Sequence, residues 1–461
     1  MVAIKIKKGL DIPITGKPAG NVKPFTQSGQ AYRSLKQIGL NLSEFSDLRF
    51  TLTAKLNDKV RIGDPIVEDR LCPGRMFVSP AAGTIIEIRR GLKRVLHDIV
   101  IEVDPVEDIK KFPPLNPNQA SRDEIIQRLM EGGGFSHIKR RPFELLADPR
   151  HLPRTIFVKA IESLPFYPPA EMQVEGHENL FQAGLDSLKK MTDGQVHLIH
   201  HANSSIFANY KNVQIHTAEG PHPIGNLSLH IQEIDPVRST QDVIWTLDAH
   251  DVLVLGSLLL KGEYFIERVI GIGGPACVPD QTGFFRVREG FPIEALLAGR
   301  VPHSEGLTRV ISGDVLTGHQ VENDDFLGFN DFALVLIREN VDRELLHFFK
   351  LGTNKYTASG AYLTGFLNPE KQTFDFTTNQ HGEARPFIDS SMYDKVMPLN
   401  VPTMNLVKAV MAEDYELAEK LGLLDVVPED FALPTFVDPS KIEMTEIIKN
   451  GLRAYSKDVL Q

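Results

Sequence analysis

The fold of this chain is decided by Thr155-Ile156-Phe157-Val158-Lys159-Ala160 and, further on, by Val196-His197-Leu198-Ile199-His200. Both stretches are short, apolar and rich in β-branched residues, which is typical of buried strands. Residues 180–191 lie between them and place apolar or small side chains on one helical face: Leu180, Phe181, Gly184, Leu185 and Leu188. A strand, a helix and a strand at this spacing predict a parallel sheet with helices packed on it. We therefore expect a Rossmann-like parallel α/β domain over residues 121–265.

The start of this domain carries a helix signal. Ser121 and Glu124 have the spacing of a capping box, in which each side chain bonds the other residue's backbone N–H. The helix pattern that follows stops at Gly132-Gly133-Gly134. A Pro- and Asn-rich linker over residues 104–120 precedes it.

Residues 51–104 predict a compact β unit of short strands and turns. Two of its segments, Asn57-Asp58-Lys59-Val60-Arg61-Ile62-Gly63-Asp64-Pro65-Ile66 and Ser79-Pro80-Ala81-Ala82-Gly83-Thr84-Ile85, resemble the biotinyl/lipoyl carrier fold, a β barrel-sandwich. Carriers of this kind expose a Lys at the hairpin tip, whereas the tip here is Arg70-Leu71-Cys72-Pro73-Gly74-Arg75. An Arg guanidinium stays protonated and cannot form the amide to the cofactor. We expect the unit to have a structural or docking role.

The rest of the chain predicts further parts of a multi-domain α+β or α/β protein. Residues 1–50 are expected to form an N-terminal segment that packs on the central domain. Residues 266–330 show short strands with Gly turns and predict a small β-grasp-like domain, and residues 331–400 predict a mixed α/β segment. Residues 401–461 predict a C-terminal helical domain, with helices over 406–421 and 444–459.

Composition excludes several classes of function. The chain has 461 residues, a net charge of −10 and two cysteines. This charge disfavours DNA and other polyanions as partners, and two cysteines cannot hold a four-thiolate zinc or iron–sulfur site. The longest apolar stretch near the middle, residues 252–260, is far short of the roughly 20 residues that a spanning helix needs. Residues 1–10 alternate apolar residues with Lys, unlike a signal peptide.

Two glycine clusters invite a phosphate-binding interpretation. A phosphate cradle needs the glycines between a strand and the start of a helix. Glu131-Gly132-Gly133-Gly134-Phe135 instead follows a helix, so we expect a helix stop. Gly271-Ile272-Gly273-Gly274 follows a strand, but Pro275 comes next and no helix opens. Neither cluster is a convincing nucleotide site.

Metal and covalent flavin sites are not expected either. His200 and His201 are adjacent on a strand and face opposite sides, so they cannot share a metal ion. Ser359-Gly360-Ala361-Tyr362 resembles a motif that carries a phosphoester-linked flavin, but that motif ends in the Thr that bears the flavin. Tyr362 replaces this Thr. No nucleophile–base arrangement stands out, and no catalytic residue is assigned.

Several short motifs, taken together and in order, resemble one family along essentially the whole chain. They are Ile6-Lys7-Lys8-Gly9-Leu10-Asp11-Ile12-Pro13-Ile14-Thr15-Gly16, Ser79 to Ile85, Arg89-Arg90-Gly91-Leu92-Lys93-Arg94-Val95-Leu96, Gly220-Pro221-His222-Pro223 and Arg309-Val310-Ile311-Ser312-Gly313. The chain is similar to the NqrA family, the A subunits of the bacterial sodium-translocating NADH:quinone oxidoreductases. That family also looks related to the NADH- and flavin-binding subunit of respiratory complex I.

The resemblance implies a peripheral subunit on the cytoplasmic side of the bacterial inner membrane. Such subunits belong to a six-subunit translocase that pumps sodium, are associated with ubiquinone and dock on the integral B subunit, while NADH and flavins are used by other subunits. The complex I relative has a Gly-rich flavin loop and cluster cysteines. Here the loop is at most a remnant, residues 131–135, and the C-terminal segment 433–439 has no Cys. We therefore expect no cofactor bound by this chain.

A ubiquinone site, if present, needs an apolar cleft with a few polar donors. The candidate residues follow the Gly turn: Phe135, Lys139, Arg140, Arg141 and Phe143. Two alternatives remain open. One is a free-standing NAD- or flavin-dependent oxidoreductase, favoured by the α/β pattern and the glycine clusters. The other is a non-redox docking protein built on the carrier-like unit.

Overall fold

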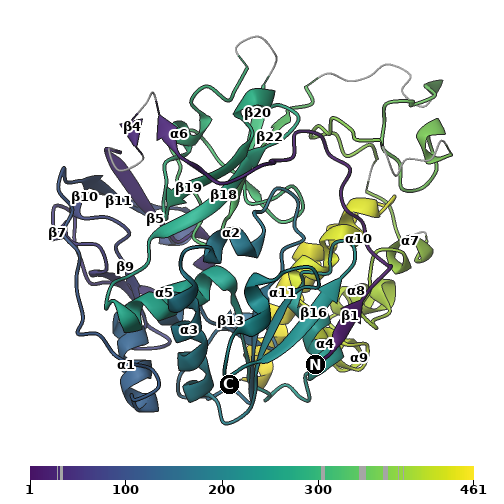
Figure 1. The fold of residues 1–461 in the computed structure, drawn as a ribbon. Helices are drawn as coiled ribbons and strands as arrows, with labels where there is room; N and C mark the ends of the chain where they lie inside the picture. The colour runs from purple at the N-terminus through teal and green to yellow at the C-terminus, as the bar shows by residue number, and fades with distance from the viewer. Residues whose placement is uncertain are drawn as a thin grey trace.

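The computed structural model describes residues 1–27, 30–31, 35–302, 307–341, 349–366, 372–382, 384–387 and 389–460. Parts of the expected segments 1–50, 266–330 and 331–400 lie outside these residues. Figure 1 shows a central sheet with helices on both faces, a second sheet above it, a β unit to its left and helices at the C-terminus, in yellow. Within the described residues, no helix is both long and apolar enough to cross a bilayer.

The central sheet has seven strands in the order β1-β16-β15-β14-β17-β12-β13. They are β1 (Ala3–Lys5), β12 (Lys139–Arg141), β13 (Leu145–Leu146), β14 (Thr155–Ala160), β15 (Val196–His201), β16 (Gln214–Glu219) and β17 (Ile244–Asp248). The first five strands in this order are parallel, and β12 and β13 form an antiparallel edge. The predicted strands at 155–160 and 196–200 are thus confirmed.

Helices cover both faces of this sheet. On one face lie α1 (Arg122–Glu131), α3 (Glu178–Met191) and α5 (Ala249–Leu260), which share one hydrophobic core with Trp245. The capping box of Ser121 and Glu124 is present at the start of α1, as predicted. The other face is covered by α4 (Leu227–Ile234) and by C-terminal helices. A short helix, α2 (Ala170–Val174), lies beside α5.

Two glycines let α3 and α5 pack very closely. A Cβ on Gly256 would lie 1.8 Å from the carbonyl oxygen of Leu180, and one on Gly184 would lie 2.2 Å from that of Val252. Real Cβ atoms do not approach backbone oxygens this closely. The backbones of the two helices are therefore in contact, and both positions need glycine.

The β unit is a pair of small sheets. One has the order β5-β11-β10-β7 and the other β6-β8-β9. Their strands are β5 (Gln37–Asn41), β6 (Phe50–Leu52), β7 (Lys59–Val60), β8 (Pro65–Asp69), β9 (Met76–Val78), β10 (Gly83–Arg90) and β11 (Leu96–Val103). β5 precedes the expected boundary at residue 51, yet it pairs with β11. The sheet thus includes residues from the N-terminal segment, which was expected to pack on the central domain.

The tip of the β unit, where carriers hold their cofactor, is packed against the central domain. Arg75 is 3% exposed and its Nη1 donates to Asp69 Oδ2 at 2.6 Å. Its other terminal nitrogen donates to the carbonyl of Ala147, just beyond β13. Cys72 in the same turn is also buried. This side of the unit is an intramolecular contact.

A six-stranded mixed sheet, here called the upper sheet, has the order β2-β19-β18-β22-β20-β21. Its strands are β2 (Lys23–Pro24), β18 (Glu267–Gly273), β19 (Gly283–Arg288), β20 (Thr308–Ser312), β21 (His319–Gln320) and β22 (Ala333–Arg338). Strands β3 (Thr26–Gln27) and β4 (Gln30–Ala31) follow β2 in the sequence and form a separate antiparallel pair. Helix α6 (Ile293–Leu297) follows β19 in the sequence.

One buried ion pair joins the upper sheet to the β unit. Arg288, at the end of β19, donates from Nη1 and Nη2 to the two carboxylate oxygens of Glu107 at 2.7 and 2.9 Å. The Arg288 side chain is 2% exposed and also donates to the carbonyl of Pro80. Glu107 in turn accepts the backbone N–H of Ala82. The pair thus holds the Ser79–Gly83 turn of the β unit against β19.

The C-terminal part is helical, as predicted, with one correction. Its helices are α7 (Ser391–Asp394), α8 (Thr403–Met411), α9 (Tyr415–Lys420), α10 (Ala432–Val437) and α11 (Met444–Val459). The single helix predicted over 406–421 is wrong, because the chain turns between α8 and α9. Glu413 there has φ +56°, and the Asp414 side chain caps α9 by accepting the N–H of Leu417. An Asp that caps a new helix competes with continuation of the old one.

Candidate functional site

The strand order of the central sheet reverses between β14 and β17. From β14 the chain runs outward through β15 and β16, and then returns to form β17 on the other side of β14. In open α/β sheets, ligands bind outside the carboxyl ends of the strands at such a reversal. The residues at this point are Lys159 and Glu162, at the end of β14, and Asp248, at the end of β17.

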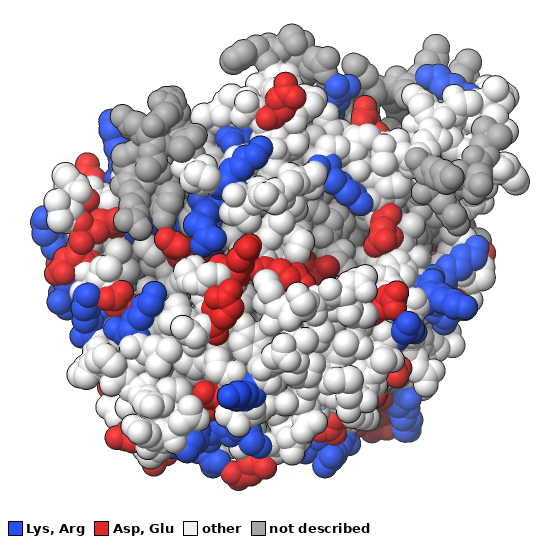
Figure 2. Space-filling view, in the orientation of Figure 1, with Lys and Arg blue, Asp and Glu red and all other residues white. Residues whose placement is uncertain are grey.

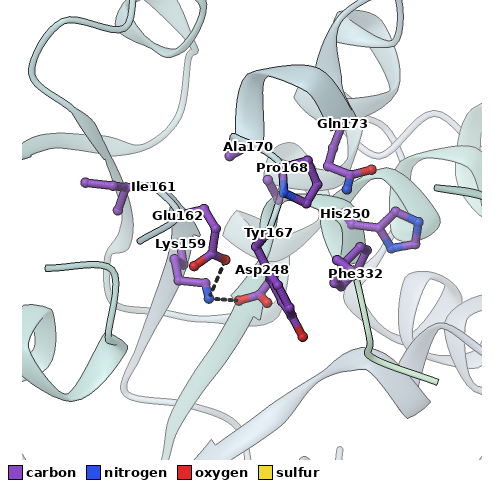
Figure 3. Close-up of a pocket in the computed structure, with 11 residues that line it drawn as sticks. Lys159, Ile161, Glu162, Tyr167, Pro168, Ala170, Gln173, Asp248, His250 and Phe332 are labelled. Atoms are coloured by element: carbon purple, nitrogen blue, oxygen red, sulfur yellow. Dashed lines mark hydrogen bonds and ion pairs between the residues drawn. The ribbon is translucent and has the colours of Figure 1, made fainter. Parts of the chain in front are cut away.

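A crevice lies at this position, between the central domain and the upper sheet. It is an open hollow of about 320 Å³, a volume that includes open solvent, and its cavity volume is about 30 Å³. Figure 3 shows Lys159, Glu162 and Asp248 on one side, with Tyr167 to their right and Phe332 near His250. The rings of Tyr167 and Phe332 meet edge to face, with their centroids 6.0 Å apart. The crevice therefore combines charged groups with two aromatic walls.

The ammonium of Lys159 bridges the two carboxylates. Its Nζ lies 3.2 Å from Glu162 and 3.6 Å from Asp248 (Figure 3). Burial lowers the pKa of Lys159, but the charges of Asp248 and Glu162 outweigh burial, and the net pKa lies above its ordinary value. Burial raises the pKa of Asp248 to about 6, although Lys159 opposes this shift. The site thus holds a permanent cation beside a carboxyl that titrates close to neutral pH.

More carboxylates converge from the C-terminal part. Burial, followed by repulsion from Glu144, raises the pKa of Glu429 to about 7. Asp430 beside it accepts a bond from Asn226, and burial raises its pKa as well. Figure 2 shows acidic side chains in a band across the middle of the molecule. The raised pKa values mean that these buried carboxyl groups bind protons at a higher pH than exposed carboxyl groups do.

We expect Glu429→Gln to stabilise the protein at alkaline pH and to have little effect in acid. Because the folded state raises the pKa of Glu429 above its unfolded value, stability from the protonated form is present below about pH 4.5 and is lost as the pH rises through 7. The neutral amide of Gln does not ionise, so the variant does not lose this stability at high pH. The effect is measured as the difference in melting temperature between variant and unmodified protein at pH 4.5 and pH 8. Glu294→Gln, which changes an exposed carboxylate, is the control. An equal effect of Glu429→Gln at both pH values would contradict the prediction.

The five residues predicted for a quinone site do not form one cluster. Phe135 is fully buried on the face of α1, α3 and α5, where its ring meets Trp245 edge to face. Arg140 pairs with Trp245 in the sheet and is 9% exposed. Lys139, Arg141 and Phe143 belong to the opposite side, which the C-terminal helices cover.

On that side, Lys139 is the accessible residue. Its side chain is 42% exposed, and Nζ lies 3.5 Å from Glu144. Burial lowers the pKa of Lys139, but Glu144 and other carboxylates, Asp248 among them, raise it above its ordinary value. Arg141 is buried and donates to Ser228 Oγ, and Phe143 packs in the core against Tyr455. Lys139 thus shares the electrostatic environment of the crevice.

The Gly-rich loop is a helix stop, as predicted. α1 ends at Glu131, Gly132 donates its N–H to Arg128, and Gly133 has a left-handed φ of +85°. Such a residue commonly ends a helix. Within the described parts of the chain, no group of three or more His, Cys, Asp or Glu side chains could hold a metal ion.

Prediction from the sequence missed most of the crevice. Lys159, Glu162, Tyr167, Asp248 and Phe332 come from three separate segments, which the fold of the chain brings together. One signal was available: Lys159 is a charged residue inside an otherwise apolar strand, and such a residue needs a buried partner.

Models of known protein domains match three parts of the chain. The NqrA N-terminal barrel-sandwich hybrid domain matches residues 4–104, the NqrA second alpha/beta domain matches residues 120–264, and the NQRA C-terminal domain matches residues 269–323.

Full-length relatives agree with these matches. The A subunit of the Na(+)-translocating NADH-quinone reductase of Chlamydia caviae is 34% identical over 99% of this chain and 97% of its own length. The protein of the same name from Saccharophagus degradans is 32% identical over 99% of this chain and 100% of its own. Among solved structures, an NAD+-reducing [NiFe]-hydrogenase aligns over 48% of each chain with a TM-score of 0.34 and 12% identity, which is too distant to support a functional comparison.

Proposed function

This chain belongs to the NqrA family, the A subunits of the Na(+)-translocating NADH-quinone reductases, and from this premise we propose a role for its crevice. The chain is one component of a sodium-pumping NADH-quinone reductase complex. We propose that it binds ubiquinone at the crevice between β14 and β17 and contributes to its reduction. In this proposal it lies at the cytoplasmic side of the bacterial inner membrane, where it docks on the integral B subunit.

The observation that carries the proposal is the crevice at the reversal of strand order. A quinone head is a flat ring with carbonyl oxygens that accept hydrogen bonds. Lys159 Nζ is a fixed donor, and the rings of Tyr167 and Phe332 offer apolar contact. The cavity volume of the crevice, about 30 Å³, is well below the roughly 300 Å³ of the smallest ligand pockets, so the side chains that line it would have to move apart to admit the quinone ring.

We propose that the segment after the Gly turn contributes to this site. We propose that Lys139 is the member of the predicted set that approaches the quinone, because its ammonium is accessible. Phe135 and Arg140, on one face of β12, and Arg141 and Phe143, on the other, would hold the strand in position. We assign these four residues a supporting role because their side chains are buried.

We also propose that this chain carries no flavin or iron–sulfur cluster, and that NADH and flavins are used by other subunits. Cys72 and Cys277 are both buried and unpaired, and they lie in different hydrophobic cores. The turn at Arg70 to Arg75 has no Lys to modify. The isolated chain should therefore be colourless.

We expect Lys159→Met to raise the KM for ubiquinone by about 10- to 100-fold. A hydrogen bond to a charged group is worth about 1.5–3 kcal/mol, and each 1.4 kcal/mol is a factor of ten. The measurement is NADH:ubiquinone reductase activity of the assembled complex at varied quinone concentration. Lys261→Met, at an exposed lysine, is the control. A KM unchanged in Lys159→Met and in Lys139→Met would exclude both lysines from the site.

A photoreactive ubiquinone tests the location directly. With the azide on the quinone ring, we expect labelled peptides from residues 135–143, 159–173 or 248–250. Labelling confined to other segments, or to other subunits, would remove the proposed site. Purification of the tagged chain from its bacterium tests docking, since the integral B subunit should be recovered with it.

A further inference from the structure

A line of four buried polar side chains joins the central domain to the upper sheet. Asp251 Oδ1 lies 3.2 Å from His137 Nδ1, and His137 Nε2 lies 2.9 Å from the hydroxyl oxygen of Tyr264. That hydroxyl lies 2.9 Å from Glu289 Oε2. The side chain of His137 is 1% exposed, and Tyr264 and Glu289 are 5% and 2% exposed. Bulk water therefore takes no part in these bonds.

The hydrogen bonds set the number of protons in this line. The Tyr264 hydroxyl has one hydrogen, yet it faces both His137 Nε2 and Glu289 Oε2. If the hydroxyl donates to an ionised Glu289, its oxygen must accept from Nε2, and because Nδ1 then donates to an ionised Asp251, His137 carries hydrogens on both nitrogens. If the hydroxyl donates to Nε2, Glu289 must be protonated and donate to the hydroxyl oxygen. Both arrangements contain one proton more than neutral His137 with ionised Glu289.

The charged groups along the line stabilise this extra proton electrostatically. Burial opposes ionisation of Asp251, but the bond and charge of His137 outweigh burial, so its pKa is lowered. Burial, followed by Glu289, raises the pKa of Tyr264 well above its ordinary value, so the hydroxyl keeps its hydrogen. Arg268 is the nearby cation, with Nη2 3.6 Å from Glu289 Oε2. With His137 charged, two negative and two positive groups alternate along the line.

The histidine next to Asp251 adds no charge to this line. His250 is the neighbour of Asp251 in α5, and burial, followed by Arg268, lowers its pKa to about 3, so it is neutral. Arg268 Nη1 donates to the carbonyls of Gly328 and Phe329, and the ring of Phe329 lies over His137 at 4.9 Å. Among the residues that the structure describes, Glu289 Oε1 has no hydrogen-bond partner.

We propose that His137, Tyr264 and Glu289 form a buried proton relay, in which one proton is shared between His137 Nε2 and Glu289 Oε2 through the Tyr264 hydroxyl. In the transfer, the Nε2–H bond breaks as an O–H bond forms on Tyr264. The original Tyr264 O–H bond breaks as one forms on Glu289. No electron is transferred and no proton leaves. The transfer moves positive charge from the central domain to the upper sheet.

The relay begins beside the crevice. Asp251 Oδ2 accepts the backbone N–H of Asp248 at 2.8 Å, in the capping box that starts α5. The Asp248 side chain is 40% exposed in the crevice. A charge that enters or leaves the crevice therefore acts on Asp251 first, and through it on the position of the shared proton. The relay does not depend on what the crevice binds.

Nitrogen-15 NMR of histidine-labelled protein and infrared spectroscopy of the carboxyl groups test the proposal together. We expect either protons on both nitrogens of His137 with Glu289 ionised, or a neutral His137 with a protonated Glu289. The infrared band of that carboxylic acid should be absent from Glu289→Gln. Neutral His137 with ionised Glu289 would overturn the relay, and so would protonation of both groups at once.

Tyr264→Phe removes one oxygen and breaks the line. We expect loss of the shared proton, leaving hydrogen on His137 Nδ1 alone and an ionised Glu289 beside Arg268. Tyr210→Phe is the matched control, because the buried Tyr210 hydroxyl has no hydrogen-bond partner in the described part of the chain. Its spectra should match those of the unmodified protein at His137 and Glu289. Unchanged spectra in Tyr264→Phe would also overturn the proposal.

Discussion

Replacing Arg288 with alanine is expected to lower the free energy of unfolding by about 3–5 kcal/mol, the usual cost of removing one partner from a buried ion pair. Arg288 is 2% exposed and makes two bonds to Glu107, which would be left as an unpaired charge in a partly buried position. The Pro80 carbonyl would also lose its donor. Urea denaturation followed by circular dichroism measures the loss.

Arg286 on the same strand provides the control. Its side chain is 30% exposed and pairs with Glu267 at 3.4 Å. Accessible ion pairs of this kind contribute about 0–1 kcal/mol, so Arg286→Ala should shift the midpoint only slightly. Similar midpoints for the two variants would show that the link between the β unit and the upper sheet does not depend on this ion pair.

Gly256→Ala is expected to destabilise the protein by about 3 kcal/mol or more, at the upper end of the cost of overpacking a core. The added Cβ would lie 1.8 Å from the Leu180 carbonyl oxygen, and backbone atoms of a helix cannot move aside individually. Helix α5 must then separate from α3. Both helices pack on the sheet that carries Lys159 and Asp248, so the crevice should be distorted too. Yield of folded protein and melting temperature are the measurements.

Gly451→Ala in α11 is the matched substitution. Its Cβ would lie 2.3 Å from Cγ1 of Val410, which is a side-chain atom that can rotate away. Alanine also favours the helix by up to about 1 kcal/mol over glycine. Gly451→Ala should therefore change stability much less than Gly256→Ala. Equal losses would mean that the cost is not set by backbone contact.

How far the sequence predicts this structure depends on how local each signal is. The strands at 155–160 and 196–200 and the helix between them were predictable because apolar periodicity is a property of each segment alone. The break at Glu413 was not, because helical periodicity continues across α8 and α9 and only the backbone turn separates them. The apolar pattern does not report such a turn.

The candidate site shows the same limit more strongly. The prediction based on the residues after the glycine run included Lys139, whose pKa is affected by carboxylates of the crevice. The same prediction included Phe135 and Phe143, which lie in two separate hydrophobic cores. Asp248 and Phe332 could not be found in this way, because their proximity is set by strand order and by the contact between two domains. Neither is encoded in a short motif.

The N-terminal strands β1, β2 and β5 belong to three different sheets, and this has a consequence for biosynthesis. Strand β1 pairs with β16 and β5 pairs with β11 (Figure 1). Strand β2 pairs with β19. Ala3 must wait for its partner Thr217 to leave the ribosome. At about 5–20 residues per second, this delay is roughly 10 to 40 s. The beginning of the chain is therefore made first but takes its final place late, and a nascent chain stalled before residue 217 would keep β1 available to chaperones.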